Sequence, residues 1–133
     1  MEVKVKLYLV DEEGDKFMGI GVLWLLEKIE TEGSLRGSAA ALGISYSKAY
    51  GMVRNLEKSL GVPVLVRKKG GASHDGATLT PFGRQFIELY RDFQAKSKKL
   101  VEGPFADFRT GLAKLLETVD DMEPMEGESG ACR

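Results

Sequence analysis

The chain has 133 residues, of which 43% are hydrophobic and 29% are charged, and its formal net charge is −1. These values are typical of one soluble globular domain, with or without an appended arm, and no apolar run approaches the roughly 20 residues of a membrane-spanning helix. The single cysteine, Cys132, excludes an intrachain disulfide framework and a thiolate metal site. Because the N-terminus alternates instead of forming the apolar core of a signal peptide, we expect a cytoplasmic protein.

Charge is distributed unevenly along the chain. Between Ser34 and Leu100 the sequence contains twelve Lys or Arg and four Asp or Glu, a local charge of +8. A local positive field attracts phosphate groups, and a distant acidic tail weakens it little because exposed charges are screened beyond about 10 Å. The charge distribution therefore favours a nucleic-acid partner, although the net charge alone argues against one.

The first predicted element is a β-hairpin. Apolar and polar residues alternate over residues 3–10, which predicts a half-buried strand. Residues 11–16 predict a turn and residues 17–19 a short returning strand, so the two strands are expected to pair.

A helix is predicted from Ile20 to about Thr31. Its apolar residues Leu23, Leu26 and Ile29 recur at helical spacing and are expected to face the core. The single tryptophan, Trp24, lies in the same helix. We expect Trp24 to pack in the core rather than to stack on a ligand.

The stretch that follows, SLRGSAAALGISYSKAYGMVRNLEKSL, predicts two helices joined by a tight turn. Ser34 can cap the first helix, whose apolar stripe is Leu35, Ala39 and Leu42. Gly43 can adopt the positive φ that a sharp helix exit requires. This arrangement is a helix-turn-helix, and an ordinary helical hairpin is the alternative.

The second helix of this pair is the candidate recognition helix. Either Ser45 or Ser47 is expected to cap it. Its other polar and aromatic side chains lie in the N-terminal half, where helix-turn-helix proteins contact DNA bases. The buried face is expected to consist of Ala49, Met52 or Val53, Leu56 and Leu60.

A second hairpin is predicted directly after the recognition helix. Residues 62–67 predict a strand, residues 68–76 a basic glycine-rich loop, and residues 77–80 the returning strand. A hairpin in this position is a wing, and the alternative is a solvated surface hairpin whose lysines serve solubility. The only histidine, His74, lies in the loop without a cluster of metal-ligating residues, so we assign it neither a metal nor a catalytic role.

The C-terminal third predicts two helices and a tail. Thr80–Pro81 is a strong helix start, and Phe82 and Phe86 of the helix 81–102 are expected to return to the core. Gly103–Pro104 is expected to break the chain before a helical arm over 103–120 and a disordered acidic tail over 121–133. Because the remaining apolar residues would form a large exposed patch, a dimer interface is favoured over a hairpin that folds back on its own domain. These residues are Leu89, Tyr90, Phe93, Leu100, Val101, Phe105, Phe108, Leu112, Leu115 and Val119.

The residues now described resemble a known family. The stretches GSLRGSAAALGISYSKAY, from Gly33 to Tyr50, and LTPFGR, from Leu79 to Arg84, are similar to the N-terminal DNA-binding domain of ModE-type molybdate-responsive regulators. That domain is a winged helix-turn-helix related to the one in LysR-type regulators. Tyr50 departs from the family, in which tryptophan is expected at this position.

The resemblance implies a mainly α-helical fold with a small β component: a winged helix-turn-helix with an N-terminal β-hairpin, a long C-terminal helix and a helical arm. It implies dimerisation through residues 3–30 and 81–102. It also implies DNA contacts from the recognition helix and the wing. The contact residues would be Ser45, Tyr46, Ser47, Lys48, Tyr50, Arg54, Arg67, Lys68 and Lys69.

From these features we expect a transcriptional regulator that binds double-stranded DNA as a homodimer at a two-fold symmetric operator. No catalytic constellation, metal-ligand cluster or cofactor motif is predicted, so we expect no enzyme. The segment after Glu102 is too short for the oxyanion-binding domain of full-length family members, so molybdate binding by this chain is not expected. The alternatives are a winged-helix module that binds proteins, or a DNA-binding subunit that depends on a separate sensor partner.

Overall fold

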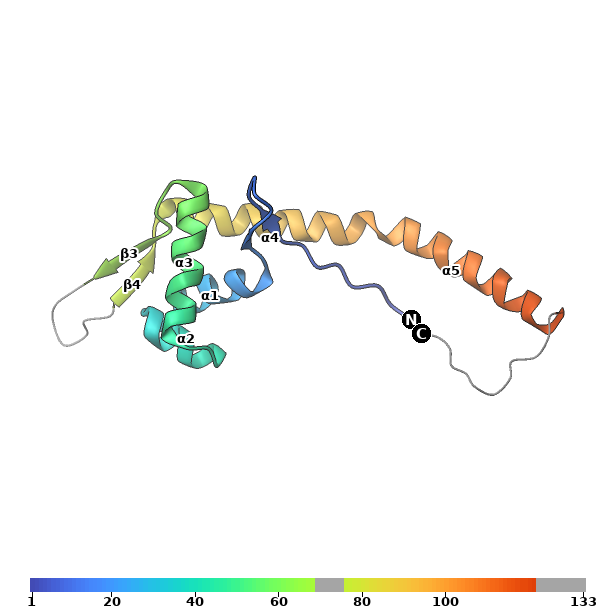
Figure 1. Cartoon of the computed structure of the whole chain (residues 1–133), viewed down its shortest axis with the longest axis horizontal. Helices are drawn as coiled ribbons and strands as arrows, with labels where there is room; N and C mark the ends of the chain where they lie inside the picture. The colour runs from blue at the N-terminus through green and yellow to red at the C-terminus, as the bar shows by residue number, and fades with distance from the viewer. Residues whose placement is uncertain (69–75, 122–133) are drawn as a thin grey trace. The chain divides into compact units, whose positions relative to one another are not determined.

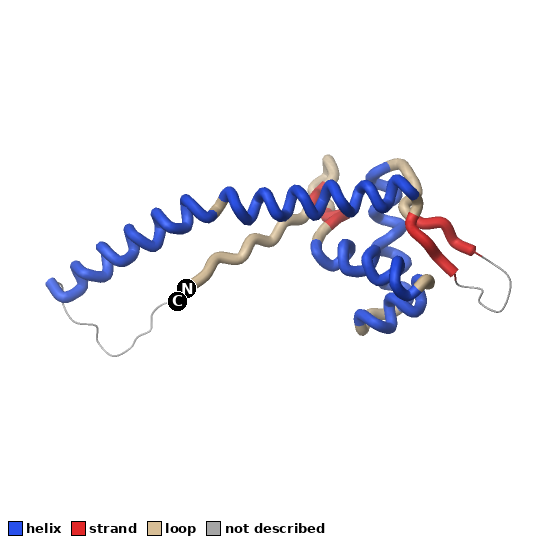
Figure 2. The backbone as a smooth tube through the Cα atoms, turned by 180° about the vertical axis from the view of Figure 1, so that it is seen from behind, coloured by secondary structure: helices blue, strands red, loops and turns tan. Residues whose placement is uncertain are grey.

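The computed structural model describes residues 1–68 and 76–121, which are mainly helical with two short strand pairs (Figures 1 and 2). Residues 5–95 form one compact unit, and residues 1–4 with the chain from Lys96 form a second. Among the described helices, none combines the length and the apolarity needed to cross a membrane. In chain order the elements are β1 (Leu9–Val10), β2 (Lys16–Met18), α1 (Ile20–Glu32), α2 (Leu35–Leu42), α3 (Tyr46–Leu60), β3 (Leu65–Lys68), β4 (Gly76–Leu79), α4 (Pro81–Leu100), α5 (Glu102–Glu117) and a 3-10 helix (Thr118–Asp121).

The N-terminal hairpin is present, but its first strand is much shorter than predicted. β1 and β2 pair antiparallel, with Leu9 opposite Met18. The prediction of a strand over residues 3–10 is wrong in length, because β2 has only three residues and pairs with only two residues of the preceding segment. The alternation still shows in the burial, since Val5, Leu7 and Leu9 are half-buried between exposed neighbours.

Helix α1 supplies the centre of the core. Leu23, Leu26 and Ile29 are buried, as predicted, and the buried stripe also includes Val22 and Leu25. The predicted core position of Trp24 is wrong, because its side chain is 54% exposed. Successive helical residues are about 100° apart, which places Trp24 opposite the centre of the stripe.

The helix-turn-helix forms as predicted, and a serine side chain caps the N-terminus of each of its two helices. The Ser34 hydroxyl oxygen accepts a hydrogen bond from the Gly37 N–H at 2.9 Å, and Ser45 rather than Ser47 caps α3 by accepting from the Lys48 N–H at 3.0 Å. Gly43 has a φ of 72°, the left-handed conformation expected at the turn. The core includes Leu35 and Ala39 of α2 and Ala49, Val53 and Leu56 of α3, while Leu42, Met52 and Leu60 are partly buried.

The second hairpin pairs Leu65 with Leu79 and ends at the pair Lys68–Gly76. Its first strand begins at Leu65 rather than at residue 62. At this start, a Glu57 carboxylate oxygen accepts hydrogen bonds from the N–H groups of Val64 and Leu65, at 2.8 and 3.2 Å. These bonds tie the start of the wing to α3. His74 and Lys69 lie outside the described residues.

Helix α4 begins as predicted but buries a different face. The Thr80 hydroxyl caps it by accepting from the Gly83 N–H at 2.9 Å. The buried residues are Gly83, Ile87 and Tyr90. The predicted core position of Phe82 is wrong, because this side chain is 39% exposed, whereas Phe86 packs partly against the core.

The interruption between α4 and α5 falls at Val101, slightly before the predicted break at Gly103–Pro104. Pro104 has no N–H to donate to the carbonyl of Leu100, and its ring would clash with that carbonyl in a continuous helix. The break therefore precedes the proline, which is tolerated in the first turn of α5. Within the described residues of α5, no side chain is buried.

Tyr90 provides a testable contribution to stability. Its hydroxyl donates a hydrogen bond to the Leu7 carbonyl oxygen at 2.8 Å, and burial raises the pKa of the phenol above its ordinary value of 10.0. Tyr90→Phe should lower the free energy of unfolding by about 1 kcal/mol at neutral pH.

The pH dependence of this contribution has a definite sign. Because the pKa of Tyr90 is raised in the folded state, its stabilising effect is complete below pH 10.0 and is lost as the pH rises through the folded-state pKa. Urea unfolding of both proteins at neutral and alkaline pH should therefore show their difference shrinking above about pH 10. A difference that stays constant into the alkaline range would contradict this assignment.

Candidate nucleic-acid interface

Five side chains from three elements form a connected cluster on the exposed side of α3. The rings of Tyr46 and Tyr50 stack, with centroids 6.1 Å apart. The Arg36 guanidinium lies 4.3 Å above the Tyr46 ring, and the Arg54 guanidinium donates a hydrogen bond to the Tyr50 hydroxyl at 2.9 Å. Arg67 joins both tyrosines, because it donates to the Tyr46 hydroxyl at 2.7 Å and lies 5.4 Å from the Tyr50 ring centroid. We call these five residues the arginine–tyrosine cluster.

The cluster follows from helical spacing and from the position of the wing. Tyr46, Tyr50 and Arg54 are four residues apart on α3, so their side chains form one row along the helix. Arg67 reaches this row from β3, and Arg36 reaches it from α2. Exposed cation–π contacts contribute roughly 0.5–1 kcal/mol each. Several such contacts together favour positions of the three guanidinium groups beside α3.

One acidic side chain lies beside this cluster. Glu57 lines a small hollow of about 60 Å³ together with Tyr50, Arg54 and Arg67. Its carboxylate accepts from the backbone N–H groups at the start of the wing, as described above. The Glu57 carboxylate is therefore hydrogen-bonded to the backbone at the start of the wing.

The structure brings together four of the predicted contact residues, Tyr46, Tyr50, Arg54 and Arg67. Ser45 caps α3, Ser47 and Lys48 are exposed in the first turn, and Lys68 is exposed at the end of β3. Lys69 lies outside the described residues. Sequence reasoning missed Arg36, whose only signal is that it is the one basic residue of α2.

Lys48 lies on a different flank of α3 from the cluster. It is two residues from Tyr46 and so roughly half a helical turn away. On this flank Lys48 lines a groove with Met52 and Asn55. The predicted contact set is therefore divided between two sides of the recognition helix.

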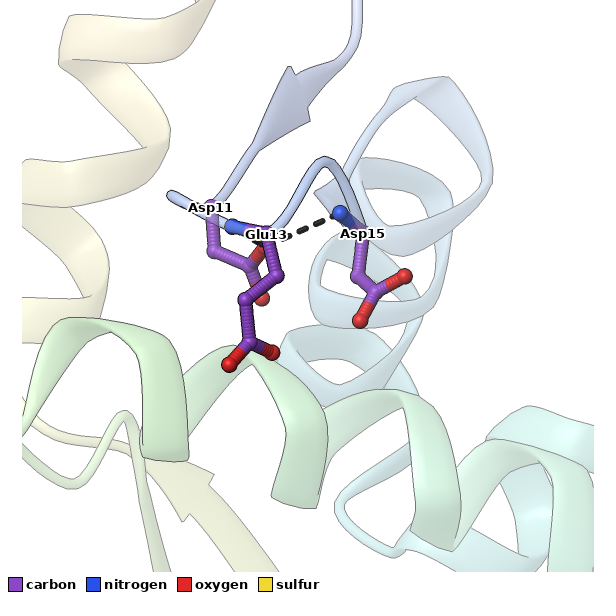
Figure 3. A group of neighbouring side chains, drawn as sticks. All are labelled: Asp11, Glu13 and Asp15. Carbon is purple, nitrogen blue, oxygen red and sulfur yellow. Dashed lines mark hydrogen bonds between the residues drawn. The ribbon is translucent and has the colours of Figure 1, made fainter.

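The turn between β1 and β2 gathers three carboxylates, and their side chains project from the same side of the turn (Figure 3). The ligand atoms of Asp11, Glu13 and Asp15 lie within 4.8 Å of one another. The Asp11 carboxylate accepts hydrogen bonds from the N–H groups of Glu13 and Asp15, both at 2.9 Å. This turn geometry accounts for the position of Asp11, and we assign no metal site here.

The helix-turn-helix, the β3–β4 wing and the packing of both against α1 define a winged helix-turn-helix DNA-binding domain. Residues 22–84 match the model of the family described as "Bacterial regulatory helix-turn-helix protein, lysR family". This part of the chain therefore matches the LysR-type helix-turn-helix family, in agreement with the resemblance.

Comparisons with individual proteins agree with this assignment. The molybdenum transport protein ModE of Azotobacter vinelandii is 31% identical over 78 residues, which are 59% of this chain and 29% of that protein. The molybdenum-pterin-binding protein MopB of Rhodobacter capsulatus is 34% identical over 84 residues, 63% of this chain and 31% of that protein. The chain thus spans less than a third of the length of these relatives.

A solved structure, the CbnR_DBD–DNA complex, is similar to this chain with a TM-score of 0.50 and 26% identity. The similarity covers 72% of this chain and 99% of that one. It confirms the predicted fold class, a mainly helical winged helix-turn-helix. It also shows that a domain of this fold has been solved on DNA.

Proposed function

We propose that the protein is a transcriptional regulator that binds specific sequences of double-stranded DNA as a homodimer. The observation that carries the proposal is the arginine–tyrosine cluster, which presents three guanidinium groups beside α3 of a LysR-type helix-turn-helix domain. Because their tyrosine partners already hold these groups, less side-chain entropy is lost when they bind a phosphate or a base edge.

The side chains divide into two proposed roles. Lys48, Arg54, Lys68 and Lys69 contact phosphates, which supplies affinity that falls as salt rises. Base edges are read from the exposed part of α3, where Arg54 has the donor geometry that suits guanine. Ser47, Tyr46 and Tyr50 are further candidates for base contacts. We add Arg36 to the set, because its guanidinium lies on the same cluster.

Exposed apolar faces support the dimer. On α4, Leu89 is 71% and Phe93 47% exposed. On α5, Phe108 and Leu115 are both about 60% exposed, and no described side chain of this helix is buried. Side chains of this size at helical spacing are normally covered, and a second copy of the same surface gives a closed two-fold interface.

Phe93→Glu should convert the dimer to a monomer, because it places a charge in the proposed apolar interface. Sedimentation equilibrium measures the change directly. Ala95→Glu is the matched control, since it adds the same charge to the same helix at an exposed position roughly half a turn away. An unchanged dimer in Phe93→Glu, or equal dissociation in both variants, would contradict the proposed interface.

Selection from a pool of randomised duplexes tests the proposed function. Enriched sites should contain inverted half-sites whose centres are about 34 Å apart or a multiple of it, because one dimer presents two recognition helices to one face of DNA. If the selected duplexes keep the sequence frequencies of the starting pool, so that no site is enriched, sequence-specific binding is contradicted. Enrichment of single, unpaired half-sites would support DNA reading but contradict the homodimer.

A further inference from the structure

A groove of about 450 Å³ lies on the flank of α3 away from the arginine–tyrosine cluster. Its walls come from four elements that pack together within the compact unit of residues 5–95. Its apolar lining includes Phe17 of β2, Trp24 of α1, Leu42 of α2 and Met52 of α3. The nucleic-acid interface described above makes no use of these apolar side chains.

The size and walls of the groove suit a small molecule. Pockets for small ligands are typically about 300–1,000 Å³ and are mainly apolar with a few polar groups. Gly21 helps to keep the groove open, because a Cβ built there would lie 3.9 Å from the Met52 methyl carbon and a longer side chain would enter the space. Trp24 contributes an aromatic surface that is 54% exposed.

The charges in the groove favour an anion. Lys16 and Lys48 line it from different elements, and its described lining includes no Asp or Glu. The Asn55 amide donates to the Lys16 carbonyl oxygen at 3.1 Å, which ties the start of β2 to α3. Phe17 and Asn55 also border the separate hollow of the acidic β1–β2 turn. An anionic group is therefore favoured at the Lys48 end of the groove, away from those carboxylates.

We propose that this groove binds a small molecule with a flat apolar body and one carboxylate, and that the carboxylate pairs with Lys48. One consequence of this binding rests on the proposed function. A bound carboxylate competes with DNA phosphates for Lys48 and so weakens DNA binding. Binding at the two sites is then negatively coupled, and the coupling is reciprocal.

The first test measures binding without DNA. We would titrate the full chain with 2-naphthoate and follow the fluorescence of Trp24, the only tryptophan, together with the NMR signal of the Met52 methyl group. Saturable changes at both residues with a dissociation constant near or below about 1 mM are expected. The uncharged analogue 2-naphthamide should bind at least several-fold more weakly.

Two variants of one residue locate the site. Gly21→Leu should abolish the saturable change because its side chain fills the groove, whereas Gly21→Ala should retain binding because its methyl group makes only an ordinary contact. Thermal unfolding checks that both variants are folded. The absence of saturable binding to the natural protein, equal binding of the amide, or full binding to folded Gly21→Leu would each overturn the groove site.

The second test measures coupling. Saturating 2-naphthoate should lower the affinity for a selected duplex several-fold in the natural protein and leave Gly21→Leu unaffected. Naphthoate binding without any change in DNA affinity would overturn the coupling. A protein that binds no specific duplex at all would overturn the proposed function instead, while the DNA-free titration would still decide the groove site.

Discussion

Gly83→Ala is expected to lower the free energy of unfolding by about 1–3 kcal/mol or more, as for other overpacked core positions. A Cβ at residue 83 would lie 2.6 Å from the Val64 carbonyl oxygen and 3.3 Å from the Val64 Cα, and these backbone atoms start the wing. The clash cannot be relieved by rotating a side chain, so α4 and the wing must move apart. Urea unfolding measures the loss.

Gly111→Ala is the matched control for this prediction. Gly111 lies inside α5, where a Cβ would meet no atom within 4 Å. Alanine in an open helical position is expected to stabilise by roughly 0.5–1 kcal/mol, because it restricts the unfolded chain and favours the helix. If Gly83→Ala were as stable as the natural protein, the close approach of α4 to Val64 would not be a constraint on the fold.

Arg54→Ala is expected to weaken binding to a selected duplex roughly ten- to a hundredfold, the equivalent of about 1–3 kcal/mol. The substitution removes one guanidinium from the arginine–tyrosine cluster and frees the Tyr50 hydroxyl from its donor. The salt dependence of the affinity should also become shallower, by up to about one phosphate contact. Fluorescence anisotropy across a salt series measures both effects.

Two further variants separate charge from geometry in this experiment. Lys58→Ala removes a positive charge one turn further along α3, outside the proposed interface, and should change affinity little. Arg54→Lys keeps the charge but loses the planar fork that pairs with Tyr50 or a guanine, so it should bind more weakly than the natural protein. Equal affinity of Arg54→Ala and the natural protein would remove Arg54 from the interface.

The local features of the fold could be predicted from sequence because each depends on a few neighbouring residues. Ser34 and Thr80 cap helices through hydroxyl groups that reach backbone N–H groups three residues ahead. Gly43 is required at its turn by the positive φ. These signals place α2, α3 and α4 without reference to the rest of the chain.

The choice of buried face depends on the partner elements, which the sequence does not specify locally. On α4, the row containing Phe82 and the row containing Ile87 are both apolar. The core takes Ile87 because Gly83, one turn earlier on the same face, lets the helix approach Val64. Trp24 is exposed for a similar reason, since the smaller residues on either side of it already fill the core.

The candidate interface could be predicted only in part. The family resemblance named Tyr46, Tyr50 and Arg54 of the second helix, and Arg67 of the wing, as expected contact residues, but the sequence analysis did not place them in one cluster. The addition of Arg36 and Arg67 depends on how α2 and the wing pack against α3, and no spacing within the chain predicts it. The same packing places Lys48 in the groove on the opposite flank.

The central claim is that this chain reads DNA sequence through α3 and the wing. The most direct measurement compares its affinity for a selected duplex with that for a scrambled duplex of equal length and composition, by anisotropy over a range of salt. We expect a preference that persists near physiological salt, with a slope that indicates several phosphate contacts per dimer. Equal affinity for both duplexes, lost at moderate salt, would contradict the claim.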